Sequence, residues 1–349
     1  MYDLTSFPLP LNLLFFAAAA SGVWFAGSRL ASYADEISDR RRMGKALMGL
    51  VFLAAATELP EVVTTMTAAI AGEAQLLLNN MFGGVTMQTA ILAVADLVAG
   101  SAALTFYPRK PTPILAGSLL ILLLAMLNAI ILLGEYALVW HIGLGSCAVA
   151  LVYLAAIAML RQYDDKEAWQ AIEVPEEPDD SPVYPWRVRL EALSMRSLVA
   201  RFAAASGLIL VCGVVLVHAS NALAEQTGLG SSFIGATLLA ATTSLPEVST
   251  TIMAVRLRAY TMAISNIFGS NLIMIILLFP ADILYRPGPV LAAADASAVF
   301  AITSGVLVTI IFVIGLVIRS SRTVRGVGVD SLLVIAVYLA TIAGLYVLR

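Results

Sequence analysis

The 349-residue sequence has few charged residues, two cysteines and two histidines, and these shortages exclude several classes of protein. Only 12% of its residues are charged, against about 25% in soluble domains. Cys147 and Cys212 lie inside apolar segments, where a disulfide framework or a thiolate metal site is not expected. With 60% hydrophobic residues and a mean hydropathy of +0.92, the composition predicts a multi-pass protein of the lipid bilayer.

The sequence also lacks a glycine-rich nucleotide-binding loop and any soluble segment long enough for a catalytic domain. We therefore expect no enzymatic activity, no cofactor and no nucleic-acid partner. The N-terminus has no basic segment before its first apolar run, which favours a retained helix over a cleaved signal peptide. The oligomeric state is left open by the sequence.

Apolar runs long enough to span a membrane occur ten times, five on each side of a polar stretch. We interpret the chain as an all-α integral membrane protein with ten transmembrane helices, near residues 11–30, 46–70, 76–105, 113–133, 138–160, 203–224, 231–255, 261–284, 297–318 and 329–348. The polar stretch, 161–200, is interpreted as an acidic cytoplasmic linker followed by a segment on the membrane surface. It separates two domains, 1–160 and 201–349.

One motif occurs twice, at 54–65 and at 240–251. The offset between the copies is 186 residues, and 16 of the 43 positions from 54 to 96 match their counterparts. Such self-similarity indicates an internal duplication. The two halves therefore share one ancestral five-helix unit.

Lysine and arginine are concentrated in alternate loops, which predicts the topology. Eighteen of the 20 basic residues fall on one side of the expected membrane and only Arg286 and Arg349 on the other. We expect the protein in a cell (plasma or inner) membrane. The positive-inside rule then places both termini outside the cytoplasm. The helix with the first motif runs outward and the helix with the second runs inward. The repeats are therefore inverted, as in many secondary transporters whose substrate sites lie near the membrane midplane.

Glu58, Glu61 and Glu247 lie in apolar helices without a nearby basic residue in the sequence. Three unpaired carboxylates would cost roughly 8–10 kcal/mol on insertion scales, so they must hold protons or bind cations. Pro60 and Pro246 each remove a backbone donor and free a carbonyl one turn earlier. Carboxylates, carbonyls and hydroxyls form a hard-oxygen set that suits Ca²⁺, and the absence of adjacent His or Cys argues against zinc or copper.

The doubled Leu-Pro-Glu motif, with a preceding Thr and a following Asn-x-x-Gly, resembles the sodium/calcium exchanger family of the Ca²⁺:cation antiporter superfamily. The residues that carry this resemblance are 243–247 and 265–271, together with their counterparts in the first half. The resemblance implies a secondary active antiporter that moves Ca²⁺, or a similar divalent cation, against Na⁺ or H⁺ by alternating access. It implies Glu61 and Glu247 as the central metal ligands.

Further cation-binding candidates follow from the same motifs. They are Thr57, Thr243 and Ser244 beside the glutamates, and Asn80, Asn266, Ser270 and Gln88 on the helices that follow. For the two asparagines, helix packing is the structural alternative to a role in the site. Five positions depart from the family pattern: Glu58 replaces Ser, Gly84 and Val85 replace Ser-Asn, and Gln88 and Met274 replace an Asn or Asp ligand.

These departures leave the coupling ion open between Na⁺ and H⁺. Glu58 precedes Glu61 by three residues, on the same helix face. Two carboxylates at this spacing cannot both stay ionised at low energy in an apolar site. This favours H⁺ over Na⁺ as the coupling ion. Alternatives from other classes are a cation channel and a non-transporting membrane scaffold or sensor. Saturable, counter-ion-dependent flux would exclude the channel, and absent ion binding would favour the scaffold.

Asp96 and Asp282 are also related by the repeat offset. We interpret both as structural, with a role in an ion vestibule as the alternative. Arg286 follows Asp282 by four residues, which predicts an interfacial ion pair.

Overall fold

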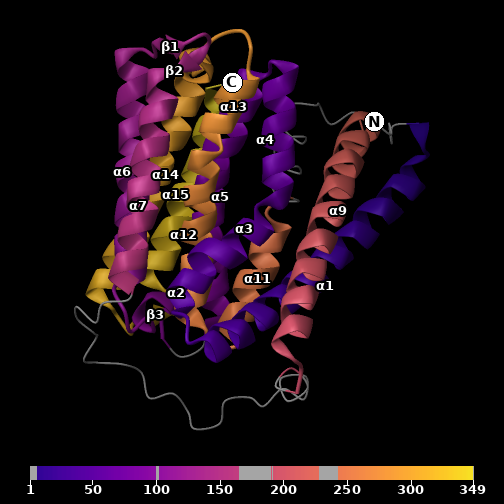
Figure 1. The fold of residues 1–349 in the computed structure, drawn as a ribbon, viewed down its shortest axis with the longest axis vertical. Coiled ribbons are helices and arrows are strands. Elements are labelled where there is room, and N and C mark those ends of the chain that lie inside the picture. The colour runs from indigo at the N-terminus through magenta and orange to yellow at the C-terminus, as the bar shows by residue number, and fades with distance from the viewer. Residues whose placement is uncertain (1–5, 100–101, 165–189, 191, 228–242, 349) are drawn as a thin grey trace.

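The structure, a computed structural model, describes residues 6–99, 102–164, 190, 192–227 and 243–348. Its described part is mostly helical, with eight helices long and apolar enough to cross a membrane and one bent helix pair that could form a ninth span. The expected run at 231–255 lies only partly within the described residues. Two long helices, α1 (Leu9–Arg41) and α9 (Met195–Thr227), pack along each other beside a bundle of the remaining helices (Figure 1).

The first half of the chain continues from α1 through a broken helix to a pair of helices joined by a hairpin. Its elements are α2 (Lys45–Leu47), the π-helix η2 (Met48–Leu53), α3 (Ala54–Thr57), α4 (Leu59–Ala71), α5 (Ala74–Ala99), η3 (Leu104–Phe106), α6 (Thr112–Leu133), β1 (Ala137–Val139), β2 (Ile142–Gly143) and α7 (Leu144–Asp164).

The second half repeats this order after α9. Its elements are α11 (Leu245–Arg256), α12 (Tyr260–Ile276), α13 (Leu278–Leu284), η5 (Val290–Ala293), α14 (Ala296–Ile318), β3 (Thr323–Val324), β4 (Val327–Gly328) and α15 (Val329–Val347). Each half thus has a two-stranded antiparallel hairpin before its last helix.

Several boundaries differ from the sequence-based expectations, and one of them is the end of α5, at Ala99 rather than near residue 105. Helix α1 runs to Arg41 rather than ending near residue 30, so Arg29 and Arg40 lie on a helix and not in a loop. Residues 138–143 form most of the β1–β2 hairpin instead of the first turns of a helix. Helix α9 begins at Met195, inside the stretch assigned to the linker. Apolar runs fail to show these boundaries because helices continue beyond the membrane and short strands can be apolar.

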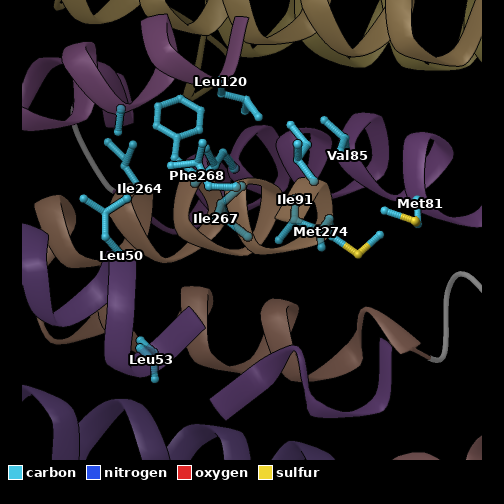
Figure 2. Packing of buried hydrophobic residues seen from close by; sticks show 14 of the residues in the cluster. Leu50, Leu53, Met81, Val85, Ile91, Leu120, Ile264, Ile267, Phe268 and Met274 are labelled. Carbon is cyan, nitrogen blue, oxygen red and sulfur yellow. The ribbon is translucent and has the colours of Figure 1, made fainter. Parts of the chain in front are cut away.

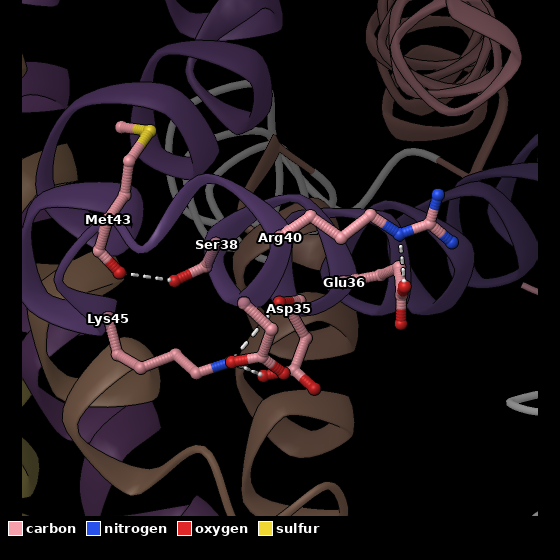
Figure 3. A network of polar contacts seen from close by, with 7 residues as sticks. Asp35, Glu36, Ser38, Arg40, Met43 and Lys45 are labelled. Carbon is pink, nitrogen blue, oxygen red and sulfur yellow. Dashed lines mark hydrogen bonds and ion pairs between the residues drawn. The ribbon is translucent and has the colours of Figure 1, made fainter. Parts of the chain in front are cut away.

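Ion pairs fix the turn between α1 and α2 (Figure 3). Helix α1 ends where Arg42 adopts a left-handed conformation with φ of 53°. Nζ of Lys45 then reaches back to Asp35 Oδ1 at 2.5 Å and to Asp39 Oδ1 at 2.7 Å. The Ser38 hydroxyl donates to the Met43 carbonyl at 2.8 Å. The start of the broken helix is thereby tied to the end of α1.

The hydrophobic core lies between η2, α5, α6 and α12 (Figure 2). Gly269 on α12 lies directly against the backbone of Leu50, where an added Cβ would come within 2.6 Å of the Leu50 Cα. Gly49 on η2 faces the backbone of Asn266 just as closely, at 2.9 Å from its nitrogen. These two glycines let η2 and α12 cross with their backbones in contact. The first motif, which follows η2, is thereby brought next to α12, the helix that follows the second motif.

Candidate cation site

The first motif breaks its helix at Glu58. The segments Lys45–Thr57 and Leu59–Ala71 meet at an angle of 53°, with Glu58 between them at φ −75° and ψ 0°. Pro60 has no N–H, so the carbonyl of Ala56 loses its usual donor four residues later. The π-helix η2 comes immediately before this break, and π-helical turns recur at functional sites. The break therefore exposes backbone oxygens in the middle of a span.

The second motif starts helix α11. Ser244 is its N-cap residue, Pro246 occupies the second helical position and Glu247 lies in the first turn. The preceding residues of this run, including Thr242, lie outside the described part of the chain. Both motifs thus place a proline and a glutamate at the N-terminus of a helix, where the helix dipole favours negative charge.

All three motif glutamates are buried. Their relative exposures are 0% for Glu58, 2% for Glu61 and 0% for Glu247. Glu61 interacts electrostatically with both of the others, so the three carboxyl groups share one region. Three ion pairs occur among the described residues, all within the α1–α2 turn region, and none involves these glutamates. Within the described chain, no basic side chain forms an ion pair with any of the three glutamates.

Four oxygen atoms of these carboxyl groups are buried without a hydrogen-bond partner. They are Glu58 Oε2, Glu61 Oε2 and both oxygens of Glu247. Such groups are rarely left unsatisfied in folded proteins. Within the described residues, no three His, Cys, Asp or Glu side chains are grouped to hold a metal by themselves. A cation held here would therefore also need hydroxyl, amide or carbonyl oxygens.

Hydroxyl and amide groups of the predicted set surround the carboxyl groups. Gln88 Nε2 donates to Glu58 Oε1 at 2.7 Å, and Thr243 hydrogen-bonds to Glu61. Thr57 lies beside Glu247 without completing a hydrogen bond to it, and its Oγ1 is 3.5 Å from Oγ of Ser270. Residues from both halves therefore meet around the glutamates.

The remaining predicted residues have other partners than the three carboxyl groups, or none, among the described residues. Asn266 is fully buried and donates to Thr250 Oγ1 at 3.2 Å, while its own Oδ1 has no partner. Asn80 is half-buried on α5 with no hydrogen bond in the described residues. Ser244 Oγ lies 3.9 Å from the sulfur of Met87. The two asparagines, although related by the repeat, are thus placed differently.

Two contacts in this region were not predicted from the sequence. Asn271 donates to Thr89 Oγ1 at 3.1 Å, and its Oδ1 is buried without a partner. Asn271 belongs to the second motif, so the sequence contained a signal for it. Gly84 and Met274 also meet, because a Cβ at Gly84 would lie 2.8 Å from Cε of Met274. Two departures from the family pattern are therefore in contact, with a methyl group filling the space beside Gly84.

Each motif proline packs against a glycine of the other half. An added Cβ at Gly213 of α9 would lie 2.6 Å from Cγ of Pro60. An added Cβ at Gly27 of α1 would lie 3.0 Å from Cβ of Ser249 and 3.4 Å from the Pro246 carbonyl oxygen. Gly27 and Gly213 are separated by the same 186 residues as the motifs. The duplication therefore also produces these two contacts.

Replacing Gly213 with alanine is expected to lower stability by about 1–3 kcal/mol, because the Pro60 ring cannot move aside as a flexible side chain could. Gly27→Ala should have a smaller effect, since the Ser249 hydroxyl can rotate away. Gly207→Ala is the matched control on α9, because nothing lies within 4 Å of its added Cβ. Thermal unfolding of the three purified variants measures the effect. Equal midpoints for Gly213→Ala and Gly207→Ala would contradict the close contact.

Comparison with known proteins identifies related sequences over most of the chain. The family model described as sodium/calcium exchanger protein matches residues 11–159 and 197–347. A putative antiporter, CaxA of Alkalimonas amylolytica, is 23% identical over 274 residues, covering 78% of this chain and 80% of its own. The inner membrane protein YrbG of Escherichia coli K12 is 24% identical over 292 residues, covering 81% and 82%.

A shorter match and solved structures agree with this result. The sodium/calcium exchanger MaX1 of Methanosarcina acetivorans is 32% identical over 113 residues, or 31% of each chain. A structure of the sodium-calcium exchanger NCX_Mj superposes with a TM-score of 0.70 at 16% identity, covering 96% of this chain and 99% of that chain. At this identity the superposition shows a shared fold.

Proposed function

The chain belongs to the sodium/calcium exchanger protein family and is a multi-pass membrane cation antiporter, and on this premise we propose that it moves Ca²⁺ or a similar divalent cation. The observation that carries the proposal is the set of four unpartnered carboxylate oxygens of Glu58, Glu61 and Glu247. A divalent cation would supply the missing positive charge. Oxygen donors alone suit Ca²⁺, which takes six to eight such ligands.

Glu61 and Glu247 are proposed as the central ligands. Each comes from a different half of the chain, and each follows a motif proline at the start of a helix. Glu58 is the third carboxylate. The further ligands proposed are Thr57, Thr243, Ser244, Asn80, Asn266, Ser270 and Gln88. Support differs among them: Thr57, Thr243, Ser270 and Gln88 contact the carboxyl groups or one another, whereas Asn80 and Ser244 rest on the motif alone.

The coupling ion is proposed to be H⁺ at least in part. One Ca²⁺ balances two of the three carboxylates, so the third must keep a proton or hold a monovalent cation. A monovalent site beside Gly84 is disfavoured by the methyl group of Met274. A proton needs no such space, because a carboxyl oxygen itself carries it.

The proposed arrangement is ten transmembrane helices in two inverted five-helix halves, 1–160 and 201–349, joined by a cytoplasmic linker at 161–200. The family model supports it by matching two segments, 11–159 and 197–347, that leave most of that linker unmatched. The hairpins β1–β2 and β3–β4 support the inversion, since they lie at opposite ends of the molecule (Figure 1). With basic loops inside, both termini face away from the cytoplasm across the cell membrane. Impermeant thiol labelling of a cysteine beside Lys110 should occur only from the cytoplasmic side.

Ca²⁺ flux in proteoliposomes tests the function. Uptake should saturate with Ca²⁺ and should require an opposing gradient of H⁺ or Na⁺, imposed separately. Saturation distinguishes exchange from a pore, whose flux would continue without a counter-ion. Uptake that needs no counter-ion, or purified protein that neither binds nor moves Ca²⁺, would overturn the proposal.

A further inference from the structure

Asp96 connects the two halves of the chain at one end of the bundle. It is fully buried near the end of α5, and both its oxygens accept backbone N–H groups. Oδ1 accepts from Leu104 at 2.5 Å, and Oδ2 accepts from Gly328 at 2.6 Å. Ser331 lies beside the same carboxylate. Leu104 belongs to the same half as Asp96, whereas Gly328 ends strand β4 of the other half.

Asp282 makes the corresponding set of bonds at the other end. It is also fully buried, on α13. Oδ1 accepts from the Val290 N–H at 2.6 Å, and Oδ2 accepts from the Gly143 N–H at 2.7 Å. The Ser146 hydroxyl is a third donor. The predicted ion pair with Arg286 is wrong: backbone donors, and not an arginine, satisfy this carboxylate.

The two sets match in their backbone donors, whereas the serines differ: Ser146 donates to Asp282, and Ser331 Oγ is buried without a hydrogen-bond partner. Each aspartate accepts from the backbone N–H of the residue eight positions later and from the N–H of the glycine that ends the hairpin of the other half. A serine lies three residues after that glycine in both sets. The hairpins are at opposite ends of the molecule, with β1, β2 and α13 at the top of Figure 1 and β3 at the bottom. Asp96 therefore binds the segment before α15, and Asp282 the segment before α7.

These carboxylates are unsuited to bind a passing cation. Both oxygens of each already face N–H groups, whose partial positive charge would repel a metal ion. Such charge-assisted bonds are stronger than neutral ones. Their chemistry fits a fixed connection between halves and argues against the ion-vestibule alternative.

We propose that Asp96 and Asp282 are positioning residues that anchor each half of the chain to the other and so hold the site's helices in register. The inference rests on the proposed function. Gln88 lies eight residues before Asp96 on α5, about 12 Å along the helix. Asp282 lies on α13, which follows α12 directly after Leu277, and α12 carries the proposed ligand Ser270. Asp96 thus anchors the helix that carries Gln88, and Asp282 anchors the segment that continues the helix of Ser270.

Asparagine variants test the anchors, because Asn replaces one acceptor oxygen with an NH₂ group that opposes the backbone N–H. In Asp96→Asn, amide hydrogen exchange should speed up at Leu104 and Gly328, and in Asp282→Asn at Val290 and Gly143. Ca²⁺ binding by the folded protein should weaken about tenfold, as for residues that orient metal ligands. Asp39→Asn is the control, since the Asp39 side chain is half-exposed and Lys45 keeps its ion pair with Asp35 in this variant.

A disulfide between the two segments should restore the Ca²⁺ affinity that Asp96→Asn loses. Thr105 Oγ1 donates to Asp330 Oδ2 at 2.6 Å, so these two side chains meet between the same two segments, and cysteines are introduced there to bridge them. With Cys147 and Cys212 replaced by alanine, the oxidised Thr105→Cys/Asp330→Cys pair in Asp96→Asn should recover Ca²⁺ affinity, and reduction should remove it. If Asp282→Asn does not fold, Ser146→Ala, which removes only one donor, takes its place.

Unchanged amide hydrogen exchange at Leu104, Gly328, Val290 and Gly143 in these variants would refute the proposal that the two aspartates anchor these segments. Faster exchange with Ca²⁺ affinity equal to that of Asp39→Asn would overturn the positioning role. Hydrogen exchange needs no transport, so failure of the proposed function leaves that part of the test independent. A protein that binds no Ca²⁺ in its wild-type form would refute the function and not the bonds.

Discussion

Replacing Glu247 with glutamine is expected to reduce Ca²⁺ transport at least about 100-fold, equal to about 2.8 kcal/mol, without unfolding the protein. Glutamine keeps the shape of the side chain and removes its charge. Both oxygens of Glu247 lack a hydrogen-bond partner, so the substitution breaks no bond within the described chain. Glu61→Gln should have a similar effect, because the central ion would lose one of its two proposed carboxylate ligands.

Stability should change in the opposite direction to activity. A buried carboxyl group without a counter-charge destabilises the fold, so a neutral amide of the same shape should leave the unfolding midpoint unchanged or raise it. Proteoliposome flux and thermal unfolding of the same preparations measure the two quantities. Glu73→Gln, at an exposed position just after α4, is the control. Full transport by Glu61→Gln or Glu247→Gln would refute the site, and a lowered midpoint would favour a structural role.

The repeat was the most informative feature of the sequence. The 186-residue offset paired Glu61 with Glu247 and Thr57 with Thr243, and the structure brings members of both pairs together. The same offset also pairs Gly27 with Gly213, and each lies against the motif of the other half. Their correspondence is present in the sequence, but their contacts with the motifs are set by tertiary packing.

Contacts between distant segments could not be predicted in the same way. Spacing along a helix suggested Arg286 for Asp282, but spacing does not show that the carboxylate is buried among backbone donors of another segment. The hairpins were missed because five or six residues between apolar runs carry little periodic signal. The backbone partners of Asp96 and Asp282 lie up to 232 residues away, and main-chain donors leave no trace in side-chain identity.

The two halves differ in side-chain chemistry where Gly84 meets Met274. Position 84 corresponds by repeat to Ser270, and position 88 to Met274. The first half therefore keeps an amide at Gln88, bound to Glu58, where the second half has a thioether. Met274 places a thioether where the first half has the amide of Gln88, while Glu58 adds a third carboxylate where the second half has Ser244. This exchange of an oxygen ligand for an ionisable one favours a proton over Na⁺.

Replacing Glu58 with glutamine is expected to reduce H⁺-driven Ca²⁺ uptake in sodium-free vesicles at least about tenfold, about 1.4 kcal/mol. Three carboxylates this close cannot all remain ionised once Ca²⁺ leaves, so release should be accompanied by proton uptake. A glutamine at position 58 can still form a hydrogen bond with Gln88, but it cannot bind and release a proton. Glu58→Ser, which restores the family residue, should likewise weaken the pH dependence of the flux.

Ca²⁺ binding separates this role from that of a fixed ligand. Proton release on Ca²⁺ addition, measured in weakly buffered solution, should fall in Glu58→Gln while Glu73→Gln matches wild type. If Glu58 only contributes an oxygen, its loss would weaken Ca²⁺ affinity and leave the number of protons released per Ca²⁺ unchanged. The decisive comparison uses wild-type protein: a pH gradient that drives no Ca²⁺ movement, where a Na⁺ gradient does, would rule out proton coupling and leave Glu58 as a fixed ligand of the site.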